Sequence, residues 1–317
     1  MKYAVKRILM LLLTMVIVSF LAFAAFELIS GSAADTMLGT QGTAEEIAAL
    51  EEKLGLNRPF LTRYFEWFCG FFTGDIGTSL RYNMPVWQLI SPKLGVTLCL
   101  SLISFILIVV VSIPLGLVSA KYNTGLRDGF WSSITQFFMA IPPFFTGVLL
   151  TWIFSIVLHW YNHGQFPGLG ENFWGSVGYL IYAAIAIAIP RIAMTMKMLR
   201  STIQNELSKG YVRTAISRGN DRSQVLKHHV LKNSLVPVVT FLAQTMAEIV
   251  AASVVVEQVF AIPGLGRLLV SSIGDRDFPV VQALVVLLAF WVVFIGMLAD
   301  IINQQIDPRL KLGGARK

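Results

Sequence analysis

The stretch LGVTLCLSLISFILIVVVSIPLGLVSA, residues 94–120, contains no charged side chain. A helix needs roughly 20 mainly apolar residues to cross the hydrocarbon core of a bilayer, and this run is long enough to do so. Pro114 lies inside the run, and the backbone groups that it frees need cover from neighbouring helices, as membrane bundles provide. The stretch predicts a transmembrane helix, which indicates that the chain is a membrane protein.

The composition of the whole 317-residue chain agrees with this prediction. Hydrophobic residues make up 55% of the chain and charged residues only 14%, with a mean hydropathy of +0.68. Soluble domains carry about a quarter charged residues, so the composition excludes an ordinary soluble domain as well as disorder and collagen-like repeats. The two cysteines, Cys69 and Cys99, are too few for a disulfide scaffold.

Further apolar segments predict a bundle of six transmembrane helices, an all-α integral membrane fold. The six spans are expected at residues 8–29, 94–120, 131–158, 177–197, 235–256 and 280–303. Pro142-Pro143 interrupts the third span. The first span follows basic residues, as a secretory signal peptide would, but its apolar run exceeds the 7–15 residues of a signal core, which favours a retained helix.

The charged residues predict which ends of the spans face the cytoplasm. With the N-terminus inside, the inner pieces hold 17 basic and 5 acidic residues, whereas the outer pieces hold 7 basic and 12 acidic residues. Cytoplasmic loops carry an excess of Lys and Arg. We therefore expect both termini inside, and the net charge of +7 indicates inner loops rather than a nucleic-acid surface.

The polar residues between the first two spans divide the chain. They predict a first helix at 1–30, an extracytoplasmic segment at 31–93, a five-helix core at 94–303 and a cytoplasmic tail at 304–317. In the outer segment, Thr43 to Glu46 fits a capping box for one helix.

A second helix is expected in the outer segment at the aromatic-rich stretch 59–72. Tyr and Trp favour the headgroup layer, so this helix lies either in the membrane interface or as a packed cap over the bundle.

The longest inner piece is the loop at 198–235, between the fourth and fifth spans. Tyr211 to Ile216 predict a short helix that ends near Gly219, and Asp221 is placed to cap another helix. A short helix across the membrane face suits docking to a cytosolic partner, and a basic loop that only faces lipid headgroups is the alternative. A nucleic-acid site is disfavoured because no aromatic platform accompanies the charge.

This loop resembles the cytoplasmic coupling motif of binding-protein-dependent ABC importer permeases. The general motif reads Glu-Ala-Ala, three residues, Gly, nine residues and Ile-x-Leu-Pro, and its acid, isoleucine and final proline are absent here. These departures resemble the peptide and nickel branch, in which the loop commonly reads Tyr-Val-Arg-Thr-Ala with Gly four residues on. The matching residues here are Tyr211, Val212, Arg213, Thr214, Ala215, Gly219, His228, His229, Asn233 and Pro237.

Four other stretches resemble the same branch, in order along nearly the whole chain. They are residues 54–59 with 74–79, the neighbourhood of Pro142, Glu257 to Arg267, and Arg276 to Gln282 with Asp307 to Arg309.

The resemblance implies a permease subunit that forms half of a translocation pathway and works by alternating access. It implies as partners a second homologous permease, two cytosolic ATPases and an extracytoplasmic binding protein, in the cytoplasmic membrane of a bacterium or archaeon. The chain has no Gly-x-x-x-x-Gly-Lys-[Ser/Thr] phosphate cradle, so we expect a non-enzymatic subunit that binds no cofactor, with ATP and Mg²⁺ on the partner ATPases. The ATPase-coupling residues would be Tyr211, Val212, Arg213, Thr214, Ala215, Gly219 and His229.

Two ionisable residues, Arg191 and Glu248, lie far from the ends of predicted spans. Arg191 is nine residues from Arg200 at the expected inner edge, a depth of about 13 Å. A charge at that depth usually faces the bundle interior or water. We therefore expect the two residues to face the pathway, either as a structural ion pair or in contact with charged groups of the substrate.

A turn is expected at Pro263 to Gly266, before the sixth span. The resemblance implies an outer gate or a contact with the binding protein there, and a plain turn is the alternative. The residues concerned are Glu257, Phe260, Pro263, Gly264 and Gly266.

Di- or oligopeptides are the first expectation for the substrate. Nickel or a metallophore is the alternative, because Glu248 nine residues before Glu257 resembles the nickel subgroup. His159 and His163 are weak candidate metal ligands, since no Cys or carboxylate cluster with metal-site spacing surrounds them. A secondary transporter or an intramembrane enzyme is more remote, because the sequence has neither an internal repeat nor a His-Glu-x-x-His motif.

Overall fold

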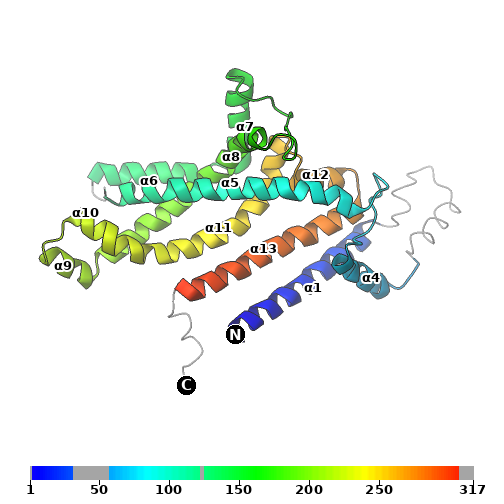
Figure 1. The fold of residues 1–317 in the computed structure, drawn as a ribbon, viewed down its shortest axis with the longest axis horizontal. Coiled ribbons are helices and arrows are strands. Elements are labelled where there is room, and N and C mark those ends of the chain that lie inside the picture. The colour runs from blue at the N-terminus through cyan, green and yellow to red at the C-terminus, as the bar shows by residue number, and fades with distance from the viewer. Residues whose placement is uncertain (1, 31–56, 122–124, 307–317) are drawn as a thin grey trace. The chain divides into compact units, whose positions relative to one another are not determined.

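A computed structural model describes residues 2–30, 57–121 and 125–306 of the chain (Figure 1). These residues are almost entirely helical, and one isolated bridge between Thr78 and Pro85 is the sole β pairing among them. The all-α prediction is therefore confirmed for the described part of the chain. The predicted capping box at Thr43 to Glu46 and the end of the tail, 307–317, lie outside these residues.

Five helices in the described ranges are long and apolar enough to cross a membrane. They are α1 (Lys2–Ser30), α5 (Val86–Lys121), α8 (Phe173–Leu207), α11 (Leu231–Val259) and α13 (Phe278–Ile306). Each corresponds to one of the predicted spans and extends beyond it at both ends. A π-helical turn, Leu226–Val230, leads directly into α11.

The predicted third span is sharply bent. α6 (Gly125–Ala140) is followed by α7 (Pro143–Thr151) and the π-helical segment Trp152–Val157, and the two parts meet at 88°. Pro142 has extended backbone angles, and neither it nor Pro143 can donate a helical hydrogen bond back to α6. A sixth span exists only if the bent pair is counted as one, so the number of six and the cytoplasmic termini stay predictions.

The chain divides into two compact units, one formed by residues 1–97 and 262–293 and the other by 98–261 and 294–317. In the first unit, the predicted aromatic helix is present as α4 (Phe60–Thr73), and Gly74 ends it with a φ of 83°. Tyr64 of α4 is buried, lies 3.0 Å from the Ser19 hydroxyl and donates to the Val16 carbonyl of α1. The helix thus packs against α1 while its other face exposes apolar side chains, here Leu61, Phe65 and Phe72.

The first unit also contains a helix where the sequence predicted only a turn, α12 (Leu265–Gly274). Its Leu265 and Leu268 pack into a core cluster with residues of α5 and α13. This contact was not predicted from the sequence. The cluster consists of Ile76, Val86, Ile90, Leu265, Leu268, Val280, Ala283 and Leu284. Burial of these side chains is the physical reason that ten residues after Gly264 fold as a helix.

In the second unit, α8 and α11 run side by side, and α6 and α7 both pack on α8 (Figure 1). α5 approaches α8 closely at Gly116, where an added Cβ would lie 2.7 Å from the Leu199 side chain. Pro190 lies inside α8 and Pro237 inside α11. α8 thus packs against four neighbouring helices, which fix the positions of its side chains.

Candidate functional site

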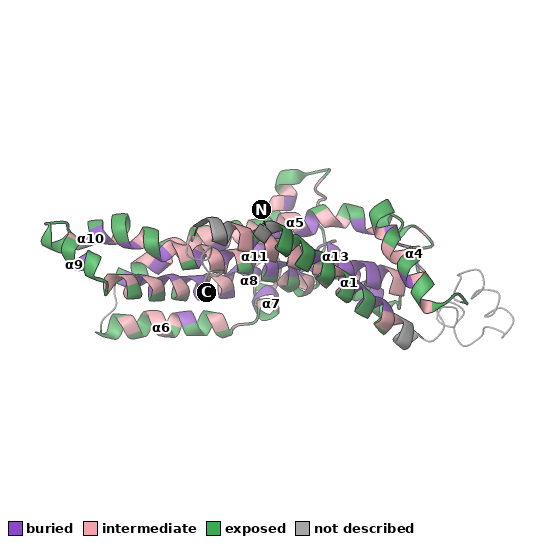
Figure 2. Cartoon of the chain, turned by 90° about the horizontal axis from the view of Figure 1, so that it is seen from below, coloured by how far each residue is buried: buried purple, intermediate pink, exposed green. Residues whose placement is uncertain are grey.

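The loop at 198–235 contains the predicted short helix, α9 (Gly210–Ser217). Val212 anchors it with a buried side chain, Ala215 is half-buried, and most of the remaining surface is exposed (Figure 2). The exposed residues include Tyr211, Arg213, Thr214 and Ile216, so α9 presents a mixed basic and apolar face. A helix that uses one side chain as an anchor and leaves its opposite face open is suited to docking a partner.

α9 ends near Gly219, as the sequence predicted. Gly219 has a φ of 85°, a left-handed conformation that glycine adopts without steric strain. Asp221 precedes α10 (Arg222–Val225), and its backbone N–H donates to the Gln224 side chain at 3.3 Å. His229, the last predicted coupling residue, is exposed in the π-helical turn before α11.

Tyr211 connects the start of α9 to both neighbouring spans, which the sequence did not predict. Its hydroxyl donates to Glu206 of α8 at 2.8 Å and accepts from the Asn233 amide of α11 at 3.3 Å. Lys209 pairs with the same glutamate. Burial raises the pKa of the Tyr211 phenol, the neighbouring Glu206 carboxylate raises it further, and the hydrogen bond from Asn233 opposes them. The phenol therefore stays protonated and holds α9 to α8 and α11.

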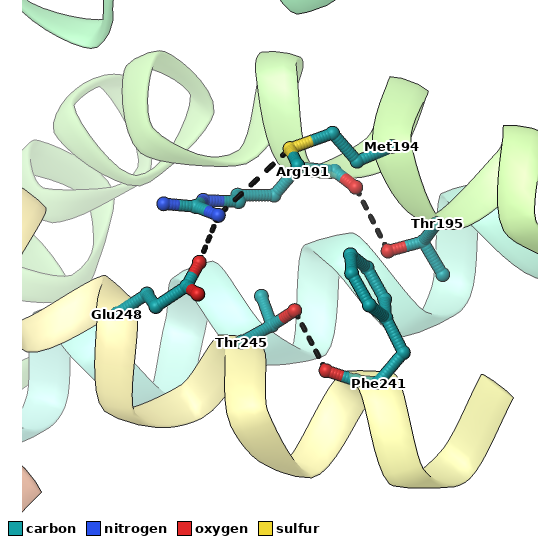
Figure 3. A network of polar contacts seen from close by, with 6 residues as sticks. All are labelled: Arg191, Met194, Thr195, Phe241, Thr245 and Glu248. Carbon is teal, nitrogen blue, oxygen red and sulfur yellow. Dashed lines mark hydrogen bonds and ion pairs between the residues drawn. The ribbon is translucent and has the colours of Figure 1, made fainter. Parts of the chain in front are cut away.

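Arg191 and Glu248 form the ion pair that the sequence left as one of two possibilities, and it joins α8 to α11 (Figure 3). The Arg191 guanidinium also lies 3.8 Å from the Met194 sulfur. The Arg191 side chain is 22% exposed and the Glu248 side chain 53% exposed. Near the middle of both helices, the structure thus places a charged pair whose acid is the more accessible member.

A second ion pair on α8 was missed from the sequence. Arg200 pairs with Asp128 in the first turn of α6, and its side chain is only 11% exposed. Its Nε atom is buried and has no hydrogen-bond partner among the described residues. The available signal was two opposite charges near the expected inner ends of adjacent spans.

The residues of the predicted outer gate fall into two groups. Glu257 and Phe260, at the end of α11, have no exposed surface. The Phe260 carbonyl accepts a 2.6 Å hydrogen bond from the Tyr179 hydroxyl of α8. A contact between these two side chains and a binding protein is therefore incompatible with this conformation, because a docked partner touches only surface atoms.

In the first unit, Gly264 and Gly266 are buried and Pro263 is half-buried. The Leu265 N–H between the two glycines donates to the Thr97 hydroxyl at 2.9 Å. In the same unit, the buried Asp277 carboxylate accepts from the Ser79 hydroxyl at 2.5 Å and from the Leu80 N–H at 3.0 Å. This second contact, also missed from the sequence, ties the segment before α5 to the turn before α13.

His159 and His163 are both exposed. The described residues contain no group of three or more His, Cys, Asp or Glu side chains that could hold a metal ion. The Nδ1 atom of His159 lies 3.2 Å from the Val157 carbonyl, a local contact. The geometry gives these histidines no shared ligand set.

Two family patterns together cover nearly the whole sequence. The pattern described as "Binding-protein-dependent transport system inner membrane component" matches residues 112–312, and its N-terminal counterpart matches residues 1–102.

Relatives of similar length carry transport names. The chain is 31% identical to a dipeptide transport system permease protein of Alkalihalophilus pseudofirmus, with 98% of this chain and 99% of the relative covered. It is 34% identical to an oligopeptide transport system permease protein of Bacillus subtilis, with the same coverage. It is 31% identical to a glutathione transport system permease protein of Salmonella paratyphi A, with 98% of each chain covered.

Proposed function

Because the chain belongs to the family of binding-protein-dependent transport system inner membrane components, we propose that it is the permease subunit of an ATP-driven importer of di- and oligopeptides. It is a multi-pass protein of the cytoplasmic membrane. Such permeases work with an ATPase and a substrate-binding protein. The relatives' names, which specify a dipeptide, an oligopeptide and the peptide glutathione, support a peptide substrate over nickel or a metal chelate.

The observation that carries the proposal is the exposed helix α9, held between α8 and α11 by the Tyr211 hydrogen bonds. A cytosolic ATPase that docks on α9 moves both spans, because the helix is tied to each of them. The proposed coupling residues are Tyr211, Val212, Arg213, Thr214, Ala215, Gly219 and His229. ATP and Mg²⁺ bind to the ATPase partners, and this chain contributes no catalytic residue.

Transport then proceeds by alternating access within a complex of two homologous permeases and two ATPases. Closure of the ATPases moves α9, which opens the pathway to the loaded binding protein, and hydrolysis resets it. The core at 94–303 contains both the coupling loop and the Arg191–Glu248 pair, which faces the pathway. The turn at Pro263, Gly264 and Gly266 acts as an outer gate.

The test is to purify the chain with its membrane neighbours, reconstitute the complex in vesicles and measure uptake of trialanine from the loaded binding protein. Uptake is expected only with ATP. The variant Arg213→Glu, on the exposed face of α9, is expected to lose the ATPases on purification, whereas Arg81→Glu in the outer segment retains them. Transport by the chain alone, or ATP-driven uptake of a nickel chelate in place of peptide, would overturn the proposal.

A further inference from the structure

α11 has a buried face and an exposed face, and each carries polar as well as apolar side chains. The buried face carries Ser234, Val238, Leu242, Thr245, Ile249, Ser253 and Val256. The exposed face carries Pro237, Gln244, Glu248, Ala251, Val255 and Gln258, at spacings of three, four or seven residues that place them along one side of a helix. Half of this exposed stripe is polar, and Glu248 lies within it.

A surface that faces lipid tails is expected to be apolar, and the exposed stripe of α5, in the same unit, has this character. It consists of Leu102, Ile106, Val110, Pro114 and Val118, which are all apolar. The hydrocarbon core offers no partner for a carboxylate or an amide, and ionisable residues within spans accordingly face a bundle interior or a water-filled cavity. The α11 stripe therefore lines an aqueous or protein-enclosed space and not lipid.

Within this stripe, Glu248 offers an accessible charge. One of its carboxylate oxygens accepts from Arg191, and the other has no hydrogen-bond donor among the described residues. The hydroxyls of Thr195 and Thr245, drawn beside the pair in Figure 3, donate to carbonyls of their own helices at 2.8 and 2.9 Å. They leave the second carboxylate oxygen open to a ligand.

We infer that Glu248 is a specificity-determining residue that binds the terminal ammonium group of the peptide as it crosses the membrane, an inference that rests on the proposed peptide import. The ammonium group donates to the open carboxylate oxygen, and the neutral Arg191–Glu248 pair admits a zwitterion without leaving a net charge. Gln244, one turn away on the same face, presents an amide that can donate to and accept from the peptide backbone.

The experiment uses the complete importer in vesicles with ATP and compares trialanine with N-acetyl-trialanine. The affinity of the binding protein for each peptide is measured first, and each is supplied at a concentration that loads the binding protein equally. Glu248→Gln is expected to slow uptake of the free peptide about tenfold or more and to leave the acetylated peptide unchanged. Glu171→Gln, at an exposed glutamate before α8, serves as the matched control and should change neither rate.

A charge swap separates substrate recognition from a structural role. The double variant Arg191→Glu with Glu248→Arg restores an ion pair but places a cation on the exposed stripe. If Glu248 binds the ammonium group, the swapped complex assembles and still transports the free peptide at least about tenfold more slowly. If the swap restores uptake of the free peptide, the pair is structural and the inference is wrong.

The remaining outcomes distinguish the inference from the proposed function. If the wild-type complex imports neither peptide, peptide import itself fails. If the wild type imports the free peptide with ATP but Glu248→Gln slows both peptides equally, or slows neither, only the ammonium site is overturned.

Discussion

The two arginine–carboxylate pairs on α8 use the same chemistry in different surroundings. Arg200 is the more deeply buried of the two arginines, and its acid, Asp128, lies in the first turn of α6, where the helix dipole favours a negative charge. Arg191 lies nine residues away along α8, and its acid, Glu248, lies on an open polar stripe near the middle of α11. One pair joins α8 to α6, and the other joins α8 to α11.

This difference separates a structural contact from an exchangeable one. At Arg200 the cation is enclosed and one of its nitrogens already has no partner, so loss of the acid leaves a buried charge uncompensated. At Arg191 the cation is less enclosed, and its acid, Glu248, is 53% exposed and can change partners while α8 and α11 remain packed. Burial of the arginine, which is 11% exposed at Arg200 and 22% exposed at Arg191, therefore indicates which pair holds the fold together.

The largest expected effect tests the structural pair. Asp128→Asn removes the counter-ion of the buried Arg200, and the expected loss in the free energy of unfolding is about 2 kcal/mol, below the value for a fully buried pair because Asp128 itself is 46% exposed. The thermal midpoint of the purified complex in nanodiscs measures it. Asp275→Asn, at an exposed acid after α12, is the matched control. Equal midpoints for the two variants would contradict a structural role for the Arg200 pair.

A smaller effect is expected at another polar contact of α8, where Glu206 accepts from Tyr211. Tyr211→Phe removes this hydrogen bond and the one from Asn233, with a net loss of about 1 kcal/mol. Because α9 is then held less firmly, we expect more ATP to be hydrolysed per peptide imported, while the ATPases still bind. Tyr82→Phe changes an exposed tyrosine of the outer segment and should leave this ratio unchanged. An unchanged ratio for Tyr211→Phe would exclude the hydroxyl from coupling.

Breaking the Arg191–Glu248 pair is expected to change the free energy of unfolding still less. Glu248→Gln should lower the free energy of unfolding by about 0.5 kcal/mol, the usual contribution of an ion pair with an accessible partner. The same thermal midpoint measures it, beside Asp128→Asn. If Glu248→Gln lowered the thermal midpoint as much as Asp128→Asn, both ion pairs would be structural and the proposed difference between them would be wrong.

The sequence predicted those features that depend on local pattern. Long apolar runs identified α1, α5, α8, α11 and α13, since a membrane span is specified by composition within one segment. The left-handed Gly219 and the short helix before it were likewise predictable from turn and cap chemistry.

Contacts between distant segments were the part that the sequence did not predict. The helix α12 forms because Leu265 and Leu268 find partners on α5 and α13, far away in the chain. The contacts of Asp277 with Ser79, and of Arg200 with Asp128, also join residues with no sequence proximity. Arg191 and Glu248 were found because a charge inside a span is conspicuous on its own, whereas Asp128 was assigned to a loop and gave no such signal.

The smallest effect is expected at Lys209, which extends the comparison to a pair in which the cation is exposed. Lys209 is 55% exposed and pairs with Glu206 at three residues' separation, a surface arrangement that contributes about 0.3 kcal/mol. Lys209→Gln should therefore barely change the thermal midpoint, and the small change should vanish at high salt because solvent ions screen an exposed pair. Glu206 keeps its hydrogen bond from Tyr211 in this variant, so the ATP consumed per peptide should stay at the wild-type value. If Lys209→Gln raised the ATP consumed per peptide as much as Tyr211→Phe, Lys209 rather than the Tyr211 hydroxyl would hold α9 in place. Burial would then not predict which polar contacts of α8 contribute to coupling.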